Sequence, residues 1–424
     1  MSLSIYTHST APWSASSYSI LVTRTLPNMV RDGHQVTLGT FYGLQGGPLP
    51  WTITEKNGKP GGTVMVFPSI NGNTYDVEVM IPAYQYFKAD ILLAICDVWV
   101  FPPEQTRHAN FVPWLPIDMD PTPEPVLKSL QTAVYPLVYS KWGVEVLAKD
   151  GVKAHYVPGS APADIYKPGD KQAARKSLAF PDDAEFVVSI VSANKDALDR
   201  KGFAEGLLGF ARFAKNHPQT YLYIHTNWGG AVDIQALVSG VSKREGIDLQ
   251  KLIIRPDPFV FAMGLLDDRY MVAVYQASDV LLNACKSEGF GLPLIEAQMC
   301  GTPVAVTDFA TTDELLFAGW KIQGQPDWSN GLNSWRIRVY IDSVVDALEE
   351  AYRNRGNEKL AQKARNGAIR FDNDTVFNQY WRPALKEIEA IVSKARVAMP
   401  NLGHDVPKVP TPTANGAHQE AVLA

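Results

Sequence analysis

The sequence predicts an α/β protein of two Rossmann-like domains, each a doubly wound parallel sheet with helices on both faces. The first observation is length, because 424 residues exceed what one ordinary hydrophobic core holds. The second is rhythm, since apolar runs of strand length alternate with helical patterns along most of the chain. Ligands bind beyond the carboxyl ends of the strands in such sheets, so functional residues are expected in the loops there.

The apolar runs form two series. In the first half we expect strands at residues 3–8, 35–40, 63–69, 91–100, 111–117 and 134–140. In the second half we expect them at residues 186–191, 221–226, 252–255, 280–285 and 303–307. Apolar residues from Ile20 to Val30 share one helical face between the first two strands, and Gly33 ends this helix because glycine accepts the left-handed position.

A stretch rich in proline and glycine, residues 158–170, separates the two series and marks the domain boundary. We expect a first domain at residues 1–165 and a second at residues 166–375. Residues 376–398 carry apolar side chains at helical spacing and predict a last helix. Residues 399–424 lose that periodicity and are typical of a flexible tail.

The composition is that of a soluble globular protein, with 46% apolar and 20% charged residues. No apolar stretch reaches the roughly 18 residues that a membrane helix needs, and no secretory core precedes the first strand, so we expect a cytoplasmic protein without a transmembrane segment. The net charge of −5 makes nucleic acid an unexpected partner. Cys96, Cys285 and Cys300 are widely spaced in apolar runs and predict buried thiols.

Two carboxylates, Glu288 and Glu296, bracket a glycine loop that opens a short helix. Pro293 is suited to the first turn of that helix, which we expect to end before Gly301. Its unpaired N–H groups and partial positive charge attract anions. Gly289 would let the backbone approach a ligand closely, as would the second loop glycine. In an arbitrary sequence, the first glutamate would only cap the helix and the second would be a solvated surface residue.

This loop resembles the Glu-x7-Glu signature of retaining GT-B glycosyltransferases of the family 4 type, also called glycosyl transferases group 1. The matching run is Ser287-Glu288-Gly289-Phe290-Gly291-Leu292-Pro293-Leu294-Ile295-Glu296-Ala297, followed by Cys300-Gly301-Thr302-Pro303-Val304. The resemblance implies a GT-B fold whose two Rossmann-like domains face a central cleft, with the last helix crossing back onto the first domain. It implies a retaining hexosyltransferase that moves a sugar from a nucleoside diphosphate sugar to an acceptor hydroxyl.

The resemblance also assigns roles to the residues of the loop. Glu296 would bind the ribose hydroxyls and Glu288 the transferred sugar. Next to Gly289, the backbone N–H groups of Phe290, Gly291 and Leu292 would contact sugar and phosphate. The second domain would hold the donor, and the first would hold the acceptor.

A cationic loop, residues 194–202, follows another expected strand end. A departing diphosphate carries roughly two negative charges and needs fixed positive partners, for which Arg200 and Lys201 are candidates and Lys195 a weaker one. A lone basic pair in a loop is usually solvated, but this one resembles the Arg-Lys-Gly element of the same transferases. The family begins this loop with Gly-Arg, whereas Lys195 follows Asn194 here, so the identity of the first cation is open.

Two further positions depart from the family. The first loop, residues 11–17, lacks the usual Gly-Gly pair, and Ser16 would supply hydrogen-bond donors to the donor phosphates instead. Asp118 takes the place of an acceptor-side histidine, as an orienting group or base; alternatively, it is a turn or capping residue before Pro121. Asp118 and Asp120 also mimic a metal-binding Asp-x-Asp. The cationic loop offers a metal-free way to neutralise the diphosphate, so we expect no required metal or other cofactor.

Of the histidines, His34 resembles a structural family position, His108 is a reserve acid/base candidate, and His225 is either packed or a nucleotide contact. Two alternative functions stay open: a sugar-phosphate synthase or phosphorylase on the same fold, and a non-catalytic sugar-nucleotide-binding protein. The sequence does not specify the sugar, the base or the acceptor, which could be a saccharide, a lipid, a protein or a small molecule.

Overall fold

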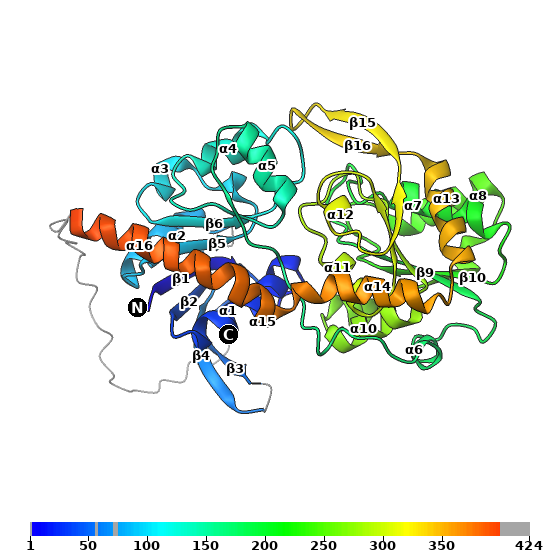
Figure 1. Cartoon of the computed structure of the whole chain (residues 1–424), viewed down its shortest axis with the longest axis horizontal. Coiled ribbons are helices and arrows are strands. Elements are labelled where there is room, and N and C mark those ends of the chain that lie inside the picture. The colour runs from blue at the N-terminus through cyan, green and yellow to red at the C-terminus, as the bar shows by residue number, and fades with distance from the viewer. Residues whose placement is uncertain (1, 56–57, 71–74, 399–424) are drawn as a thin grey trace, which may run out of the picture.

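The computed structural model describes residues 2–55, 58–70 and 75–398; the predicted flexible tail, residues 399–424, lies outside them. Two parallel α/β sheets lie side by side, one built from each half of the chain (Figure 1). The α/β class is therefore confirmed, and the strands of both sheets follow the alternating rhythm of the sequence.

The first sheet has the strand order β3-β4-β2-β1-β5-β6-β7-β8. All neighbours are parallel except β3 and β4, which pair antiparallel. Its strands are β1 (Ser4–Thr10), β2 (Gln35–Tyr42), β3 (Leu49–Thr54), β4 (Pro60–Phe67), β5 (Ile91–Ile95), β6 (Phe111–Leu115), β7 (Leu137–Val138) and β8 (His155–Tyr156). Its helices are α1 (Ser17–Arg31), α2 (Val77–Tyr86), α3 (Pro103–Thr106), α4 (Glu124–Leu130) and α5 (Lys141–Lys149), with a 3-10 turn, η1 (Val98–Val100).

The second sheet has the order β11-β10-β9-β12-β13-β14 and is parallel throughout. Its strands are β9 (Phe186–Val191), β10 (Thr220–His225), β11 (Ile253–Ile254), β12 (Val280–Asn283), β13 (Val304–Thr307) and β14 (Gly319–Ile322). Its helices include α6 (Lys171–Ser177), α7 (Phe203–Ala214), α8 (Ile234–Glu245), α9 (Pro258–Ala262), α10 (Asp268–Ala277), α11 (Leu292–Met299), α12 (Thr311–Glu314), α13 (Ile341–Arg353) and α14 (Glu358–Ala368).

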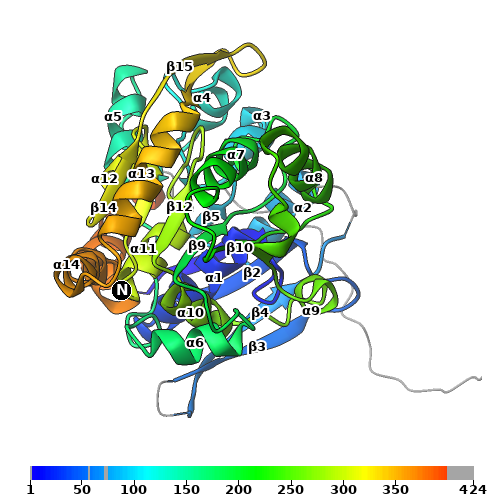
Figure 2. The ribbon, with the colours of Figure 1, turned by 90° about the vertical axis from the view of Figure 1, so that its right-hand side faces the viewer.

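Helices cover both faces of the second sheet, as the doubly wound pattern requires (Figure 2). The core on one face is shared by α7, α8 and α13, and the core on the other by α6, α10 and α11. The second of these cores continues through Phe290 and Trp381 into the first domain, so the two halves share buried apolar contacts. This continuity fixes the strand ends of the two sheets relative to each other.

The chain ends in α15 (Asn373–Val376), a π-helical turn (Phe377–Trp381) and α16 (Arg382–Ala398), which lies along the first domain (Figure 1). The Trp381 ring stands edge-on to Trp114 at 4.7 Å, and the Tyr135 hydroxyl donates to Glu387 at 2.6 Å. A C-terminal segment thus returns from the second sheet to the first, as the resemblance implied.

Two expected strands are shorter than predicted, and three strands were not predicted at all. The strand expected at residues 91–100 ends at Ile95, because Asp97 breaks the apolar run and η1 follows. The strand expected at 134–140 is only Leu137–Val138. The antiparallel strand β3 and the hairpin of β15 (Gly324–Ser329) and β16 (Ser334–Val339) were not foreseen, because their residues are largely exposed and lack a continuous apolar run.

Candidate functional site

The loop between β12 and α11 presents a helix N-terminus toward the first domain. Gly291 caps α11 with a φ of +95°, a conformation that other residues adopt only with strain. Gly289 is needed for a different reason from the one expected, since an added Cβ would lie 2.2 Å from the Pro116 Cβ of the first domain. The two glycines therefore set the helix start and the close approach of the domains.

The other two residues of the loop turn their side chains into the core. Phe290 packs edge-on against Tyr139 and tilted against Phe371, and Leu292 is equally buried. No hydrogen bond joins the backbone N–H of Phe290, Gly291 or Leu292 to any residue that the structure describes. Because the first N–H groups of a helix have no partner within it, these donors are suited to an anionic ligand.

Four of the predicted charged side chains meet at this loop. The Lys201 Nζ lies 2.6 Å from a Glu288 carboxylate oxygen. The Arg200 Nη1 donates to Asp118 at 3.1 Å and to the Ser287 carbonyl at 2.8 Å. Asp118 comes from the end of β6, so its pair with Arg200 joins the two domains. The alternative of a turn-capping Asp118 does not account for this contact.

The chain places the two cations by local geometry. Gly202 precedes α7 with a φ of +69°, and an added Cβ there would lie 2.0 Å from the Ala284 carbonyl oxygen. The loop carrying Arg200 and Lys201 is therefore seated directly against the end of β12. Burial alone would raise the pKa of Glu288, but the nearby Lys201 ammonium and Arg200 guanidinium lower that pKa below its usual range. The carboxylate is ionised at neutral pH.

Glu296 lies in a second charged cluster, at the junction of α1 and α11. Its side chain is only 6% exposed and pairs with Arg24 of the first domain at 2.8 Å. Its other carboxylate oxygen accepts from the Tyr275 hydroxyl at 2.7 Å. Arg24 also donates to the Ser160 carbonyl and to Tyr166. The alternative of a solvated Glu296 is therefore wrong, and both oxygens of the carboxylate already have protein partners.

Residues 170–367 match the family model of glycosyl transferases group 1. This part of the chain is a glycosyl transferases group 1 domain. The D-inositol 3-phosphate glycosyltransferase of Rhodococcus erythropolis is 26% identical over 243 residues, which cover 54% of this chain and 52% of that protein. The protein of the same name from Stackebrandtia nassauensis is 24% identical over 330 residues, covering 71% and 68%. The chain thus spans about half the length of the first of these relatives.

Solved structures agree on the fold of the whole chain. A glycosyltransferase from Rickettsia africae covers 92% of this chain and 99% of its own, with a TM-score of 0.63 at 13% identity. Anabaena HepE in complex with UDP-glucose covers 92% and 100%, with a TM-score of 0.62 at 16% identity. The fold is GT-B. The group 1 domain is its second half, and the Glu288 loop and the cationic loop both lie within that domain.

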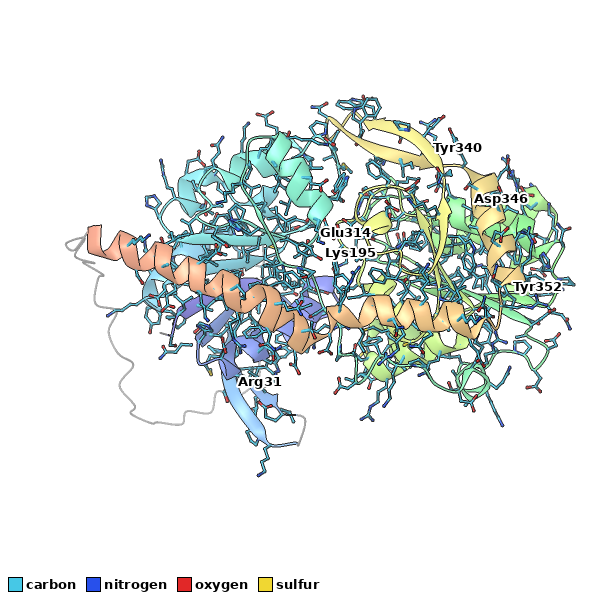
Figure 3. The ribbon with its side chains drawn as sticks, viewed as in Figure 1. Arg31, Lys195, Glu314, Tyr340, Asp346 and Tyr352 are labelled. Atoms are coloured by element: carbon cyan, nitrogen blue, oxygen red, sulfur yellow. The ribbon has the colours of Figure 1, made fainter. Side chains whose placement is uncertain are left out.

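Lys195 and Ser16 are the two remaining candidates for donor binding. Within the described residues Lys195 makes no ion pair, and it lies exposed where the group 1 domain meets the first domain (Figure 3). The Ser16 hydroxyl accepts from the Ser19 N–H at 3.0 Å and lies 2.9 Å from Thr10 Oγ1. Ser16 is thus the N-cap of α1, a structural role in which its hydroxyl already has two protein partners.

The secondary candidates of the first domain are placed apart. His108 precedes β6, whereas Asp118 follows it, so the five residues of β6, about 16 Å, separate them and His108 is at the wrong edge. Asp118 and Asp120 also diverge, since the latter pairs with Lys149 at 2.9 Å. His34 accepts from the Leu3 N–H, in keeping with a structural residue.

His225 of the group 1 domain is packed among rings of Phe261 and Tyr270, and burial lowers its pKa to about 4. Among the described residues no three His, Cys, Asp or Glu side chains gather as metal ligands would. Nor does any helix in the described ranges have the length and apolarity to cross a membrane.

Sequence reasoning missed Asp97 and Arg24. Asp97 follows β5 and accepts from the Tyr18 hydroxyl; burial raises its pKa, which the Arg200 and Lys201 charges partly offset. An aspartate inside a ten-residue apolar run was the signal, because most strands are shorter than that run. Arg24 gave no comparable signal, since one arginine within a helix is usually solvated.

Proposed function

We propose that this chain transfers a sugar from a nucleoside diphosphate sugar to an acceptor hydroxyl, with retention of the anomeric configuration. The observation that carries the proposal is the meeting of Glu288, Lys201 and Arg200 at the unpaired N–H groups of α11. A carboxylate suited to sugar hydroxyls, two fixed cations and an anion-binding helix end thus surround one position. Such fixed charges stabilise a leaving diphosphate most where water is excluded.

In the proposed reaction the bond between the anomeric carbon and the diphosphate oxygen breaks as the acceptor oxygen bonds to the same face of that carbon. The acceptor proton passes to the departing phosphate oxygen. Arg200 and Lys201 would stabilise the negative charge on the diphosphate, and Glu288 would hold the hydroxyls of the transferred sugar. The backbone N–H groups at Phe290, Gly291 and Leu292 would contact sugar and phosphate, next to Gly289.

The two ion pairs seen here would rearrange when the donor binds. Lys201 would exchange part of its contact with Glu288 for phosphate, and Arg200 would exchange part of its contact with Asp118. Asp118 would then be available to orient the acceptor. Glu296 can receive ribose hydroxyls only if the Arg24 or Tyr275 contact is shared or displaced. Lys195 would add a mobile positive charge, and Ser16 would serve mainly by capping α1.

We also propose that transfer needs no metal ion, because side-chain cations and the helix end supply the positive charge. Activity should then survive excess EDTA. A loss of activity that Mg²⁺ or Mn²⁺ restores would contradict this part of the proposal. The names of the Rhodococcus and Stackebrandtia relatives and the UDP-glucose of the Anabaena structure support a nucleotide-sugar donor and a hydroxylated acceptor.

Thermal-shift screening with UDP-, GDP- and ADP-sugars tests the donor first. A ligand at 100 times its dissociation constant stabilises the folded state by about 2.7 kcal/mol, which a thermal shift detects. The anomeric proton coupling of the product, read by NMR, then tests retention. Consumption of inorganic phosphate or of a sugar phosphate would instead indicate the sugar-phosphate phosphorylase or synthase alternative. Binding without turnover on any acceptor would indicate a binding protein.

A further inference from the structure

Three exposed aromatic side chains stand along the carboxyl edge of the first sheet, across from the proposed donor site. We call Trp13, Tyr42 and Trp99 the aromatic rim; their exposed fractions are 48%, 57% and 54%. Large apolar side chains on loops are usually covered, and a group of exposed ones at a strand edge marks a ligand-binding surface. Trp13 belongs to the first loop, residues 11–17, but none of the three rim residues was itself assigned to donor binding.

The sheet topology brings the rim together. Tyr42 ends β2 opposite Thr10 of β1, Trp13 follows β1, and Trp99 follows β5 on the other side of β1. Neighbouring strands are about 4.8 Å apart, so the rim spans roughly two strand spacings, enough for a ring-sized ligand. Each of these residues therefore projects from the same edge that carries Asp118.

Local contacts hold the rim residues in place. The Trp13 indole N–H donates to the Gly43 carbonyl at 2.6 Å, which anchors Trp13 beside Tyr42. Trp99 stands edge-on to Tyr75 with ring centroids 5.9 Å apart, and Tyr75 packs on Phe41 at 5.2 Å. Trp13 and Trp99 are thus each held by a neighbouring residue while about half of each side chain stays exposed, which lowers the entropy that binding would cost.

The charge of the surrounding loops restricts the ligand. Five of the loops at this edge contain no lysine or arginine: residues 8–17, 42–48, 67–70, 96–102 and 116–122. The same loops carry Asp97, Asp118 and Asp120. From the first domain, a phosphorylated acceptor or a nucleic acid would meet these carboxylates and Lys149, which is already paired with Asp120. Of the second-domain cations, Arg200 and Lys201 are paired with Asp118 and Glu288, whereas Lys195 is exposed and has no ion pair within the described residues.

We propose that the aromatic rim binds a neutral sugar ring of a saccharide acceptor. A sugar ring offers flat C–H faces that stack on indole and phenol rings, and hydroxyls that donate to carboxylates such as Asp97 and Asp118. Exposed aromatic rings beside hydrogen-bond acceptors, in loops that contain no lysine or arginine, match that chemistry. That the bound sugar is the acceptor rests on the proposed function; that the rim binds a neutral sugar does not.

Saturation-transfer NMR on the full chain tests binding directly, with methyl glucoside, methyl mannoside and maltose as probes. Glucose 6-phosphate and octanol are the competing probes. We expect signal from neutral sugars that falls at least fivefold in Trp13→Ala and Trp99→Ala. The control is Tyr86→Ala, an equally exposed aromatic at the end of α2, on the side of the sheet where β5 begins. It should bind as the unaltered protein does.

Kinetics separate this inference from the proposed function. With any acceptor that supports transfer, Trp99→Ala should raise the acceptor KM roughly tenfold, the scale of losing one aromatic contact, with kcat and donor affinity nearly unchanged. Preference for glucose 6-phosphate or for octanol over methyl glucoside, or neutral-sugar binding that the rim variants keep, would overturn the inference. Sugar binding at the rim in a protein that transfers nothing would uphold it and contradict the proposed function instead.

Discussion

The carboxyl edges of the two sheets share one topology and differ in chemistry. The second edge combines Arg200 and Lys201 with a helix N-terminus and Glu288, whereas the first combines the aromatic rim with Asp97 and Asp118. Parallel sheets place loops at such an edge whatever their sequence, so the fold alone does not assign donor and acceptor. We base the proposed assignment on the difference in loop charge, because Arg200 and Lys201 of the second edge would neutralise a diphosphate.

The two edges are also tied to each other by charge. Arg200 of the second domain pairs with Asp118 of the first, and Arg24 of the first pairs with Glu296 of the second. Each pair uses a residue that the proposed reaction needs. The proposed reaction therefore predicts that opening the domains and binding the donor are coupled. Substitutions on either edge test this comparison.

The largest effect is expected from removing the cations of the second edge. Arg200→Ala with Lys201→Ala should lower turnover roughly a thousandfold, about 4 kcal/mol of barrier, since fixed partners of the leaving group are lost. Steady-state kinetics measure this. The matched control is Arg212→Ala with Lys215→Ala, a second Arg and Lys pair that shares Glu245 at the surface of this domain. If the turnover of the Arg200→Ala Lys201→Ala variant stayed within threefold of that control, these cations would have no special role at the second edge.

The second-largest effect is expected from the buried ion pair of Arg24 and Glu296, which links the two domains. Arg24→Met leaves the Glu296 carboxylate buried without its cation, so the free energy of unfolding should fall by about 3 kcal/mol. Denaturant unfolding measures it, and adding Glu296→Gln should recover part of the loss. Arg31→Met on the same helix breaks a partly exposed pair with Glu55 and a hydrogen bond to Asn28, and it should cost under about 1 kcal/mol. Equal losses in the two variants would show that Arg24 does not join the domains electrostatically.

Glu288→Gln tests the sugar side of the second edge. Turnover should fall about a hundredfold while nucleoside diphosphate affinity changes little, because the carboxylate is proposed to contact the sugar. Calorimetry measures the affinity for the nucleoside diphosphate, and steady-state kinetics measure the turnover. Glu205→Gln, in another partly buried pair with a lysine, provides the control. A parallel loss of affinity and turnover would reassign Glu288 to nucleotide binding or folding.

One methyl group added at Gly289 should change how closely the two domains approach each other. Gly289→Ala places a Cβ against Pro116 and should destabilise the closed arrangement by about 1 to 3 kcal/mol. Combining it with Pro116→Gly should restore the loss, whereas Gly331→Ala, with open space around it, should be neutral. Thermal unfolding compares the stability of Gly289→Ala, of Gly289→Ala with Pro116→Gly, and of Gly331→Ala. Failure of the second substitution to rescue the first would mean that the domains do not meet there.

The smallest expected effect concerns pH at the first edge. Because burial raises the pKa of Asp97, the folded state binds more protons than the unfolded state between the unfolded and folded pKa values. Its contribution to stability therefore declines as pH rises through that window. Asp97→Asn should flatten this part of the stability profile and leave the protein slightly more stable at neutral pH. An unchanged profile would place Asp97 in contact with water.

The sequence predicted most of the fold and the second edge well, and the first edge poorly. Glu288, Arg200 and Lys201 could be predicted because each lies in a loop that connects a strand of the second sheet to the next helix, so local order decides their position. Arg24 could not, since its partner Glu296 is 272 positions away on the other domain. Trp99 was hidden inside a run that was taken as one long strand. Such residues depend on how the domains pack, which no local pattern encodes.

The most direct test compares nucleoside diphosphate with nucleoside monophosphate by calorimetry, using the base selected in the thermal screen. We predict that the unaltered protein binds the diphosphate at least tenfold more tightly, and that this preference disappears in Arg200→Ala with Lys201→Ala while persisting in Arg212→Ala with Lys215→Ala. A preference that survives removal of Arg200 and Lys201 would contradict the assignment of the diphosphate to the second edge.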